Sequence, residues 1–86
     1  MNLEILLPFK KIEYNNIKYI TVPGEKGYFS IYQNHSNIIA IIGVGILKIK
    51  YDNNIFVNYE VNFGILKVCK NQIMISVNSL YKKNDT

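Results

Sequence analysis

The chain has very few of the residues on which disulfide, zinc and phosphate chemistry depend. It contains one cysteine and one histidine, Cys69 and His35, and all 10 of its positively charged residues are lysines. A lone cysteine excludes an internal disulfide and favours a reducing compartment, and one histidine with one cysteine cannot complete a tetrahedral zinc site. Without arginine, the chain lacks the planar side chain that binds phosphates and base edges through two parallel hydrogen bonds. A disulfide scaffold and a self-contained zinc module are therefore excluded, and a nucleic-acid reader is disfavoured.

Residues suited to catalysis are equally sparse. No two of the 6 acidic residues stand at a spacing that suggests a general acid–base pair. Ser30 and Ser36 lie near His35 in the sequence, but neither is surrounded by the tight turn that presents a nucleophile. A glycine-rich loop between a strand and a helix, which would hold a phosphate, is missing as well. We therefore expect no catalytic residue, no metal and no cofactor.

Long apolar segments are also absent. The N-terminus, Met1–Ile5, has neither the basic region nor the long apolar core of a secretory signal. The most apolar run, Ile38–Leu47, contains two glycines and has about half the length needed to span a bilayer. Any contact with a membrane is therefore expected to come through a partner.

What the chain does contain is enough for one small folded domain. Its 86 residues allow a single domain, and a hydrophobic content of 49% excludes a disordered tail. Only 19% of the residues are charged, which leaves neutral polar and apolar surface for a protein partner. The net charge of +4 comes from lysines scattered along the sequence, and this scatter favours a solvated surface over a polyanion site.

Alternation of apolar and polar residues dominates the chain and predicts strands. Ile73, Ile75 and Val77 share one face, and Lys67 points outward between Leu66 and Val68. Asparagine- and glycine-rich turn signals break the chain at regular intervals, including those at 15–16, 23–24, 34–37, 43–45, 52–54, 62–64 and 70–72. The pattern predicts an all-β fold, a single small flattened β-sandwich or barrel of about eight to ten short strands.

One strand departs from this alternation. The run Ile38–Ile42 is apolar at every position, which is typical of a strand that is buried on both faces. Burial within the core is the simpler interpretation. Burial beneath a partner is the alternative, because an exposed run of this kind favours aggregation.

An ordered set of short motifs identifies a family resemblance. The segment from Val22-Pro23-Gly24 through Gly27 to His35 is similar to the pattern V-P-G-x-x-G-x-aromatic/Leu-G-Ile/Leu-x-x-x-His of the ATP synthase epsilon subunit, called delta in mitochondria. Three later segments resemble that family's strands in the same order, namely Gly45–Ile49, Phe63–Val68 and Asn71–Ile75. Some positions depart from the family pattern: Ser30 replaces Gly, Asn37 and Val44 replace Pro, and Phe63 replaces the first of two glycines.

The resemblance implies a domain, a function and partners. Residues 1–80 would form the epsilon-type N-terminal β-sandwich and residues 81–86 a short polar tail. The protein would be a non-catalytic rotor subunit of the central stalk, joining the gamma subunit to the c-ring and coupling ion flow to ATP synthesis. It would be a peripheral membrane protein on the cytoplasmic face of an energy-coupling membrane, or on the matrix or stromal face in an organelle. Most bacterial relatives continue into two C-terminal helices that can inhibit ATP hydrolysis, and a chain that stops after its last strand is expected to lack that inhibition.

The resemblance also implies residue roles. The residues expected at the interface with gamma and the c-ring are Glu25, Lys26, Tyr28, Ser30, Tyr32, His35 and Val44. The residues expected to form structural turns are Pro23, Gly24, Gly27, Gly45 and Gly64. Tyr28 stands where many family members have an acid, so an ion pair with the c-ring is not expected here. For His35, a structural role in its loop and a role in the interface both stay open. The alternative functions are a β-sandwich adaptor for another protein and a small nucleic-acid-binding β-barrel.

Overall fold

The computed structural model describes residues 1–52 and 55–83, and every regular element within them is a strand. The all-β prediction is confirmed, with eight strands in one open sheet. These are β1 (Asn2–Leu6), β2 (Lys11–Tyr14), β3 (Tyr19–Gly24), β4 (Gly27–Tyr32), β5 (Ile38–Asp52), β6 (Ile55–Cys69), β7 (Gln72–Val77) and β8 (Leu80–Lys83).

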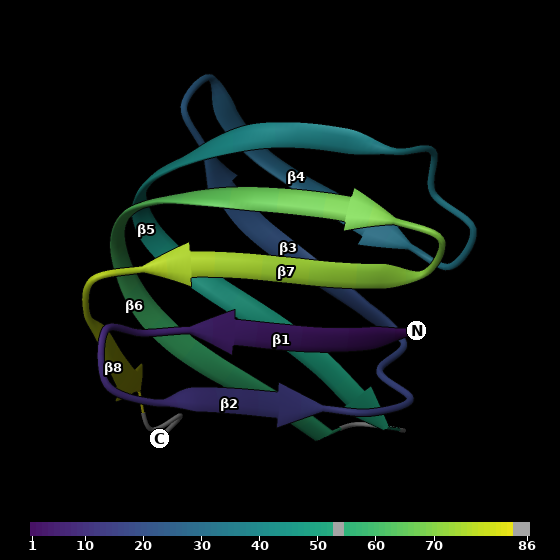
Figure 1. The fold of residues 1–86 in the computed structure, drawn as a ribbon, viewed down its shortest axis with the longest axis horizontal. Helices are drawn as coiled ribbons and strands as arrows, with labels where there is room; N and C mark the ends of the chain where they lie inside the picture. The colour runs from purple at the N-terminus through teal and green to yellow at the C-terminus, as the bar shows by residue number, and fades with distance from the viewer. Residues whose placement is uncertain (53–54, 84–86) are drawn as a thin grey trace.

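The strands follow the order β2-β1-β7-β6-β5-β3-β4, and β8 pairs with the first part of β6. All neighbours are antiparallel except β1 and β7, which run parallel and bring the N-terminal strand beside the C-terminal part of the chain. The hairpin of β5 and β6 connects the two layers of the domain, because each strand has 15 residues and curves from one layer into the other (Figure 1).

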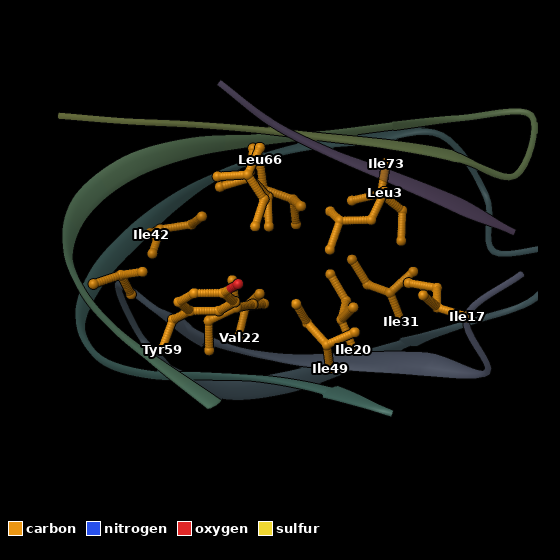
Figure 2. Close-up of a cluster of buried hydrophobic side chains, with 14 of the residues drawn as sticks. Leu3, Ile17, Ile20, Val22, Ile31, Ile42, Ile49, Tyr59, Leu66 and Ile73 are labelled. Carbon is orange, nitrogen blue, oxygen red and sulfur yellow. The ribbon is translucent and has the colours of Figure 1, made fainter. Parts of the chain in front are cut away.

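This hairpin changes the side it buries halfway along. Ile42 and Leu47 on β5 are both buried, although five residues separate them and a flat strand would place them on opposite faces. On β6, Val61 and Leu66 show the same change. Both strands therefore fold over at a shared corner, and the two halves of the sheet enclose one core from opposite sides, as Figure 2 shows.

The corner depends on glycine and on one strained residue. Phe63 has a φ of 60°, in the left-handed region that few non-glycine residues adopt. A Cβ on the neighbouring Gly64 would lie 2.4 Å from the Ser76 carbonyl oxygen on β7. The sheet can fold here because Gly64 lets β7 approach the corner without a collision. The turn signals at 43–45 and 62–64 thus mark this corner within continuous strands, and the prediction that they separate strands was wrong.

The core confirms most of the predicted alternation. Ile73, Ile75 and Val77 are buried along β7, and Leu66 and Val68 are buried on β6 with Lys67 exposed between them. The run Ile38–Ile42 differs from the simpler expectation. Along this part of β5, more buried and more exposed side chains alternate, and Ile39 and Ile41 are 74% and 53% exposed. A pleated strand presents successive side chains to opposite faces, and no layer of the described chain covers the outer one.

Several predicted turns have the expected backbone. Asn16, Asn34 and Asn71 all have positive φ, between 57° and 63°, in line with the tolerance of asparagine for this conformation. The signal at 52–54 lies partly outside the described residues. Of the expected tail, Tyr81–Lys83 belong to β8, and Lys83 forms an ion pair of 3.6 Å with Glu60 on β6. Residues 84–86 lie outside the described part of the chain.

A tyrosine pair joins the two layers beside β2, which is an edge strand of the sheet. The hydroxyls of Tyr14 on β2 and Tyr59 on the first half of β6 are hydrogen-bonded. Burial raises the pKa of Tyr14 well above the ordinary tyrosine value, and the bond to Tyr59 raises it further. The pair holds β2 against the opposite layer, where β2 has no further strand to pair with.

The corner gives a direct test. Gly64→Ala is expected to lower the free energy of unfolding by about 1–3 kcal/mol, because its methyl group would collide with the backbone of β7. Gly43→Ala is the matched control on the same corner, since its Cβ would come no closer than 3.5 Å to the atoms around it. Urea denaturation of the two variants measures the difference. Equal stability of both would show that the corner does not depend on Gly64.

Candidate protein interface

The hairpin of β3 and β4 presents a charged tip. Glu25 and Lys26 form the two-residue turn between the paired Gly24 and Gly27, and both charged side chains are exposed. Gly27 has a φ of 129°, and a Cβ on Gly24 would lie 2.8 Å from the Gly27 carbonyl oxygen. Neither position leaves room or backbone freedom for a side chain without strain, which favours glycine at both.

Tyr28 fastens this hairpin to β5. The Ile46 N–H donates to the Tyr28 hydroxyl at 2.9 Å. This hydrogen bond lies where the pairing of β3 with β5 shifts in register, between Thr21 and Gly24. Pro23 stands in the same interval and has no N–H to donate to the neighbouring strand. A Cβ on Gly45 would lie 2.5 Å from the Tyr28 hydroxyl and 2.7 Å from the Pro23 side chain. Gly45, Pro23 and Tyr28 therefore pack closely together where the hairpin meets β5.

The rest of β4 extends away from the tip. The Ser30 hydroxyl is bonded to that of Thr21 on β3 at 2.8 Å, and the Tyr32 ring packs on Tyr19 with 5.1 Å between ring centroids. Tyr32 is 58% exposed, so its outer side is open to a partner. Ser30 is half-buried and held by its neighbour, which favours a structural role.

His35 lies in the loop after β4, at the end of the strand opposite to the charged tip (Figure 1). Its ring Nδ1 is 2.7 Å from the Ser36 carbonyl oxygen and can donate to it. A reciprocal pair holds the loop, because the Asn34 N–H donates to the Asn71 side-chain oxygen at 2.6 Å and the Asn71 amide donates back at 3.1 Å. The half-buried ring is therefore fixed in its loop and still reachable by a partner.

The structure divides the predicted interface residues between two places. Val44 is 68% exposed and directly follows Gly43. A Cβ on Gly43 would lie 3.9 Å from the Glu25 Cα, so Val44 lies beside the charged tip. Tyr32 and His35 lie at the other end of β4. The seven residues are therefore not one patch.

Sequence reasoning missed an exposed hydrophobic surface on the outer side of the other layer. Ile41 on β5 pairs with Ile65 on β6, and Ile39 and Met74 lie on either side of Lys67 in the next row. We name this surface the apolar face; its members are Ile39, Ile41, Phe63, Ile65 and Met74, and they are between 38% and 74% exposed. The unbroken run Ile38–Ile42 was the signal for it, since only every second residue of a strand is needed for the core.

Open hollows border the apolar face on both sides. One lies between Ile39–Ile41 and the charged hairpin at 24–29, and the other lies between Phe63–Ile65 and the turn after β1 at 6–8. Beyond β7, Lys11 contacts Glu13 at 3.2 Å and Glu4 at 3.5 Å, and the bond to Glu13 is the main cause of a raised Lys11 pKa. These charges satisfy one another, whereas the exposed Lys67, between Ile39 and Met74, has no ion pair among the described residues.

The described residues contain no group of three His, Cys, Asp or Glu side chains that could hold a metal ion. They also contain no helix of the length and apolarity needed to cross a membrane. What the geometry offers is a rigid sandwich with an apolar face and a charged tip, which is the surface of a protein-binding domain.

The comparisons with known proteins agree with this class. The model of the ATP synthase Delta/Epsilon chain beta-sandwich domain matches residues 1–83. The ATP synthase epsilon chain of Leptospira borgpetersenii is 29% identical over 75 residues, which cover 87% of this chain and 58% of that protein. The chloroplastic epsilon chain of Medicago sativa is 29% identical over 85 residues, which cover 99% of this chain and 62% of that protein. The chain belongs to the ATP synthase delta/epsilon family.

Two solved structures share the fold. The central stalk and c-ring structure of the Tetrahymena thermophila mitochondrial ATP synthase contains a chain with a TM-score of 0.81 and 20% identity, covering 94% of this chain and 65% of that one. A chain of the Euglena gracilis mitochondrial ATP synthase has a TM-score of 0.85 and 17% identity, covering 93% of this chain and 51% of that one. The present chain thus spans roughly three-fifths of the length of the curated relatives named above.

The hydroxyl of Tyr28 can be tested separately from its ring. Tyr28→Phe is expected to lower the free energy of unfolding by about 0.5–1.5 kcal/mol, because the Ile46 N–H loses its acceptor. Tyr32→Phe removes a hydroxyl of similar exposure from the same strand, and we expect it to change stability little. Thermal or urea unfolding of both variants measures this. If the two substitutions cost the same, the bond to Ile46 does not fasten the hairpin.

Proposed function

We propose that this protein is a non-catalytic rotor subunit of a rotary ATP synthase, placed in the central stalk where it joins the gamma subunit to the c-ring. Its family membership and the named relatives support this assignment. The subunit carries torque and takes no part in bond making or breaking. It acts at an energy-coupling membrane, as a peripheral subunit on the cytoplasmic side or on the equivalent side of an organelle, and contacts the membrane only through the complex.

The apolar face is the observation that carries the proposal. A domain with five exposed large hydrophobic residues on one sheet face gains free energy when another protein covers them. We assign this face to gamma. Tyr32 lies on the other layer and outside this contact, whereas His35, in the loop after β4, would add to the contact only at its margin.

The charged tip provides a second, smaller contact. Glu25 and Lys26 project beyond the sandwich on a turn fixed by two glycines, with Tyr28 and Val44 beside them. A short polar tip matches the polar loops that a c-ring presents outside the membrane. The apolar face and the tip are joined by β5, so one stiff element links both proposed contacts.

A rotor joint must resist shear between its two contacts. The two long strands belong to both layers, and the closed amide pair of Asn34 and Asn71 joins the loop after β4 to the turn between β6 and β7. Force applied at one layer is therefore transmitted through continuous backbone. A hinge between separate units would store the rotation as bending instead.

Binding to the cognate gamma subunit tests the apolar face. We expect the wild-type chain to form a one-to-one complex in native mass spectrometry, and Ile41→Lys to weaken it by about tenfold or more, because a charge would be buried among isoleucines. Ile55→Lys is the matched control, since Ile55 is 50% exposed, as Ile41 is 53%, but lies outside the apolar face.

Two results would count against the proposal. One is the absence of a complex at micromolar concentration, which would favour an adaptor for another protein. Another is equal weakening by the two lysine variants. Circular dichroism of each variant confirms that the sandwich is retained, so that lost binding is not lost folding.

A further inference from the structure

The sandwich has a second outer surface with different chemistry. On the layer of β4, β3, the second half of β5 and the first half of β6, the strand register aligns two rows of side chains. The first row is Tyr32, Tyr19, Lys50 and Phe56, and the second is Ser30, Thr21, Lys48, Asn58 and Lys83. We name these two rows the lysine–tyrosine face. It contains three lysines and no acid.

Two of these lysines meet over a single ring. The Lys50 Nζ lies 4.2 Å and the Lys48 Nζ 5.2 Å from the centroid of Phe56. The ring attracts both ammonium groups but does not neutralise them. Among the described residues, the ion pairs involve Lys11 and Lys83 only, so Lys48 and Lys50 have no carboxylate partner there. The next acid along β6, Glu60, is paired with Lys83.

The remainder of the face is aromatic and hydroxylic. Tyr19 and Tyr32 are in ring contact beside Lys50, and the hydroxyls of Thr21 and Ser30 are bonded to each other beside Lys48. Tyrosine is favoured in protein interfaces because it offers both an apolar ring and a hydrogen-bonding hydroxyl. The face thus combines the unpaired Lys48 and Lys50 with tyrosines, whereas the apolar face on the other layer consists of hydrophobic side chains around the single exposed Lys67.

We propose that the lysine–tyrosine face is a second docking surface, and that its occupant is a carboxylate-rich segment of a protein partner. Residues two apart on a strand are separated by about 6.5–7 Å, which is close to the spacing of acids four apart on a helix. One helical turn with two carboxylates can therefore contact Lys48 and Lys50 together, while its aliphatic stems pack on Tyr19 and Tyr32. Compact ammonium groups suit single carboxylates, and the arginine forks that favour phosphates are absent.

This surface is independent of the contact assigned to gamma. The apolar face belongs to β7 and to the other halves of β5 and β6, so the two surfaces lie on opposite sides of the core. Both can be occupied at once. A substitution on one is therefore expected to leave binding at the other unchanged, and failure of this proposal would not affect the proposed function.

A peptide titration followed by amide NMR tests the proposal on the free chain. The probe is a helical glutamate-rich peptide, and its control is the same peptide with glutamine at every glutamate. We expect the acidic peptide to shift amide signals of β3, the second half of β5 and the first half of β6, with an affinity that falls as salt rises. The glutamine peptide should shift none of them.

The matched variants are two double substitutions with the same loss of charge. Lys48→Gln with Lys50→Gln should weaken the acidic peptide about tenfold or more and leave gamma binding unchanged. Lys10→Gln with Lys26→Gln removes two exposed lysines outside the face and should weaken the peptide less than twofold. Folding of both is checked by their unperturbed core signals.

Other outcomes would overturn the proposal. These are equal weakening by both double variants, peptide shifts spread over all exposed lysines, and no shifts at all. A single-stranded oligonucleotide or phosphatidylglycerol vesicles binding the same face more tightly than the acidic peptide would also overturn it, in favour of phosphate recognition.

Discussion

The architecture depends on one constraint, which is that two long paired strands must change the side they bury at the same point. A strand buries every second residue, so a shared change of face requires a shared irregularity. Phe63 in the left-handed region and Gly64 without a side chain supply it on β6, and Gly43 and Gly45 flank the corresponding position on β5. Because this corner exists, a single sheet can enclose its own core.

The corner also determines where the proposed contact surfaces lie. On either side of it, the same two strands present opposite outer surfaces, one of isoleucines and one of lysines and tyrosines. The charged hairpin tip lies beside the corner, held by Tyr28 across Gly45. One small sheet thereby offers chemically distinct surfaces on opposite sides of one core.

Sequence reasoning could predict what local rules determine. The strand class and the buried positions of β7 follow from alternation, and the structure confirms them. Turn chemistry predicts a turn beside Gly24, where the structure has the two-residue turn of Glu25 and Lys26. It could not show that Ile39 and Ile41 are exposed, because a sequence does not say how many layers cover a strand. The meeting of Lys48 and Lys50 over Phe56 was equally hidden, since it depends on the register of β5 and β6 across a hairpin.

The parallel pairing of β1 with β7 has a consequence for synthesis of the chain. Leu3 and Ile5 on β1 reach their buried positions only beside Ile73 and Ile75 on β7, so β1 must wait until β7 has been synthesised. On the ribosome, the β3–β4 hairpin and then the β5–β6 hairpin can form while β1 is paired with β2 alone and still lacks β7. Closure of the sandwich is therefore a late event, and until it occurs the nascent chain exposes core as well as interface isoleucines to chaperones and to other chains.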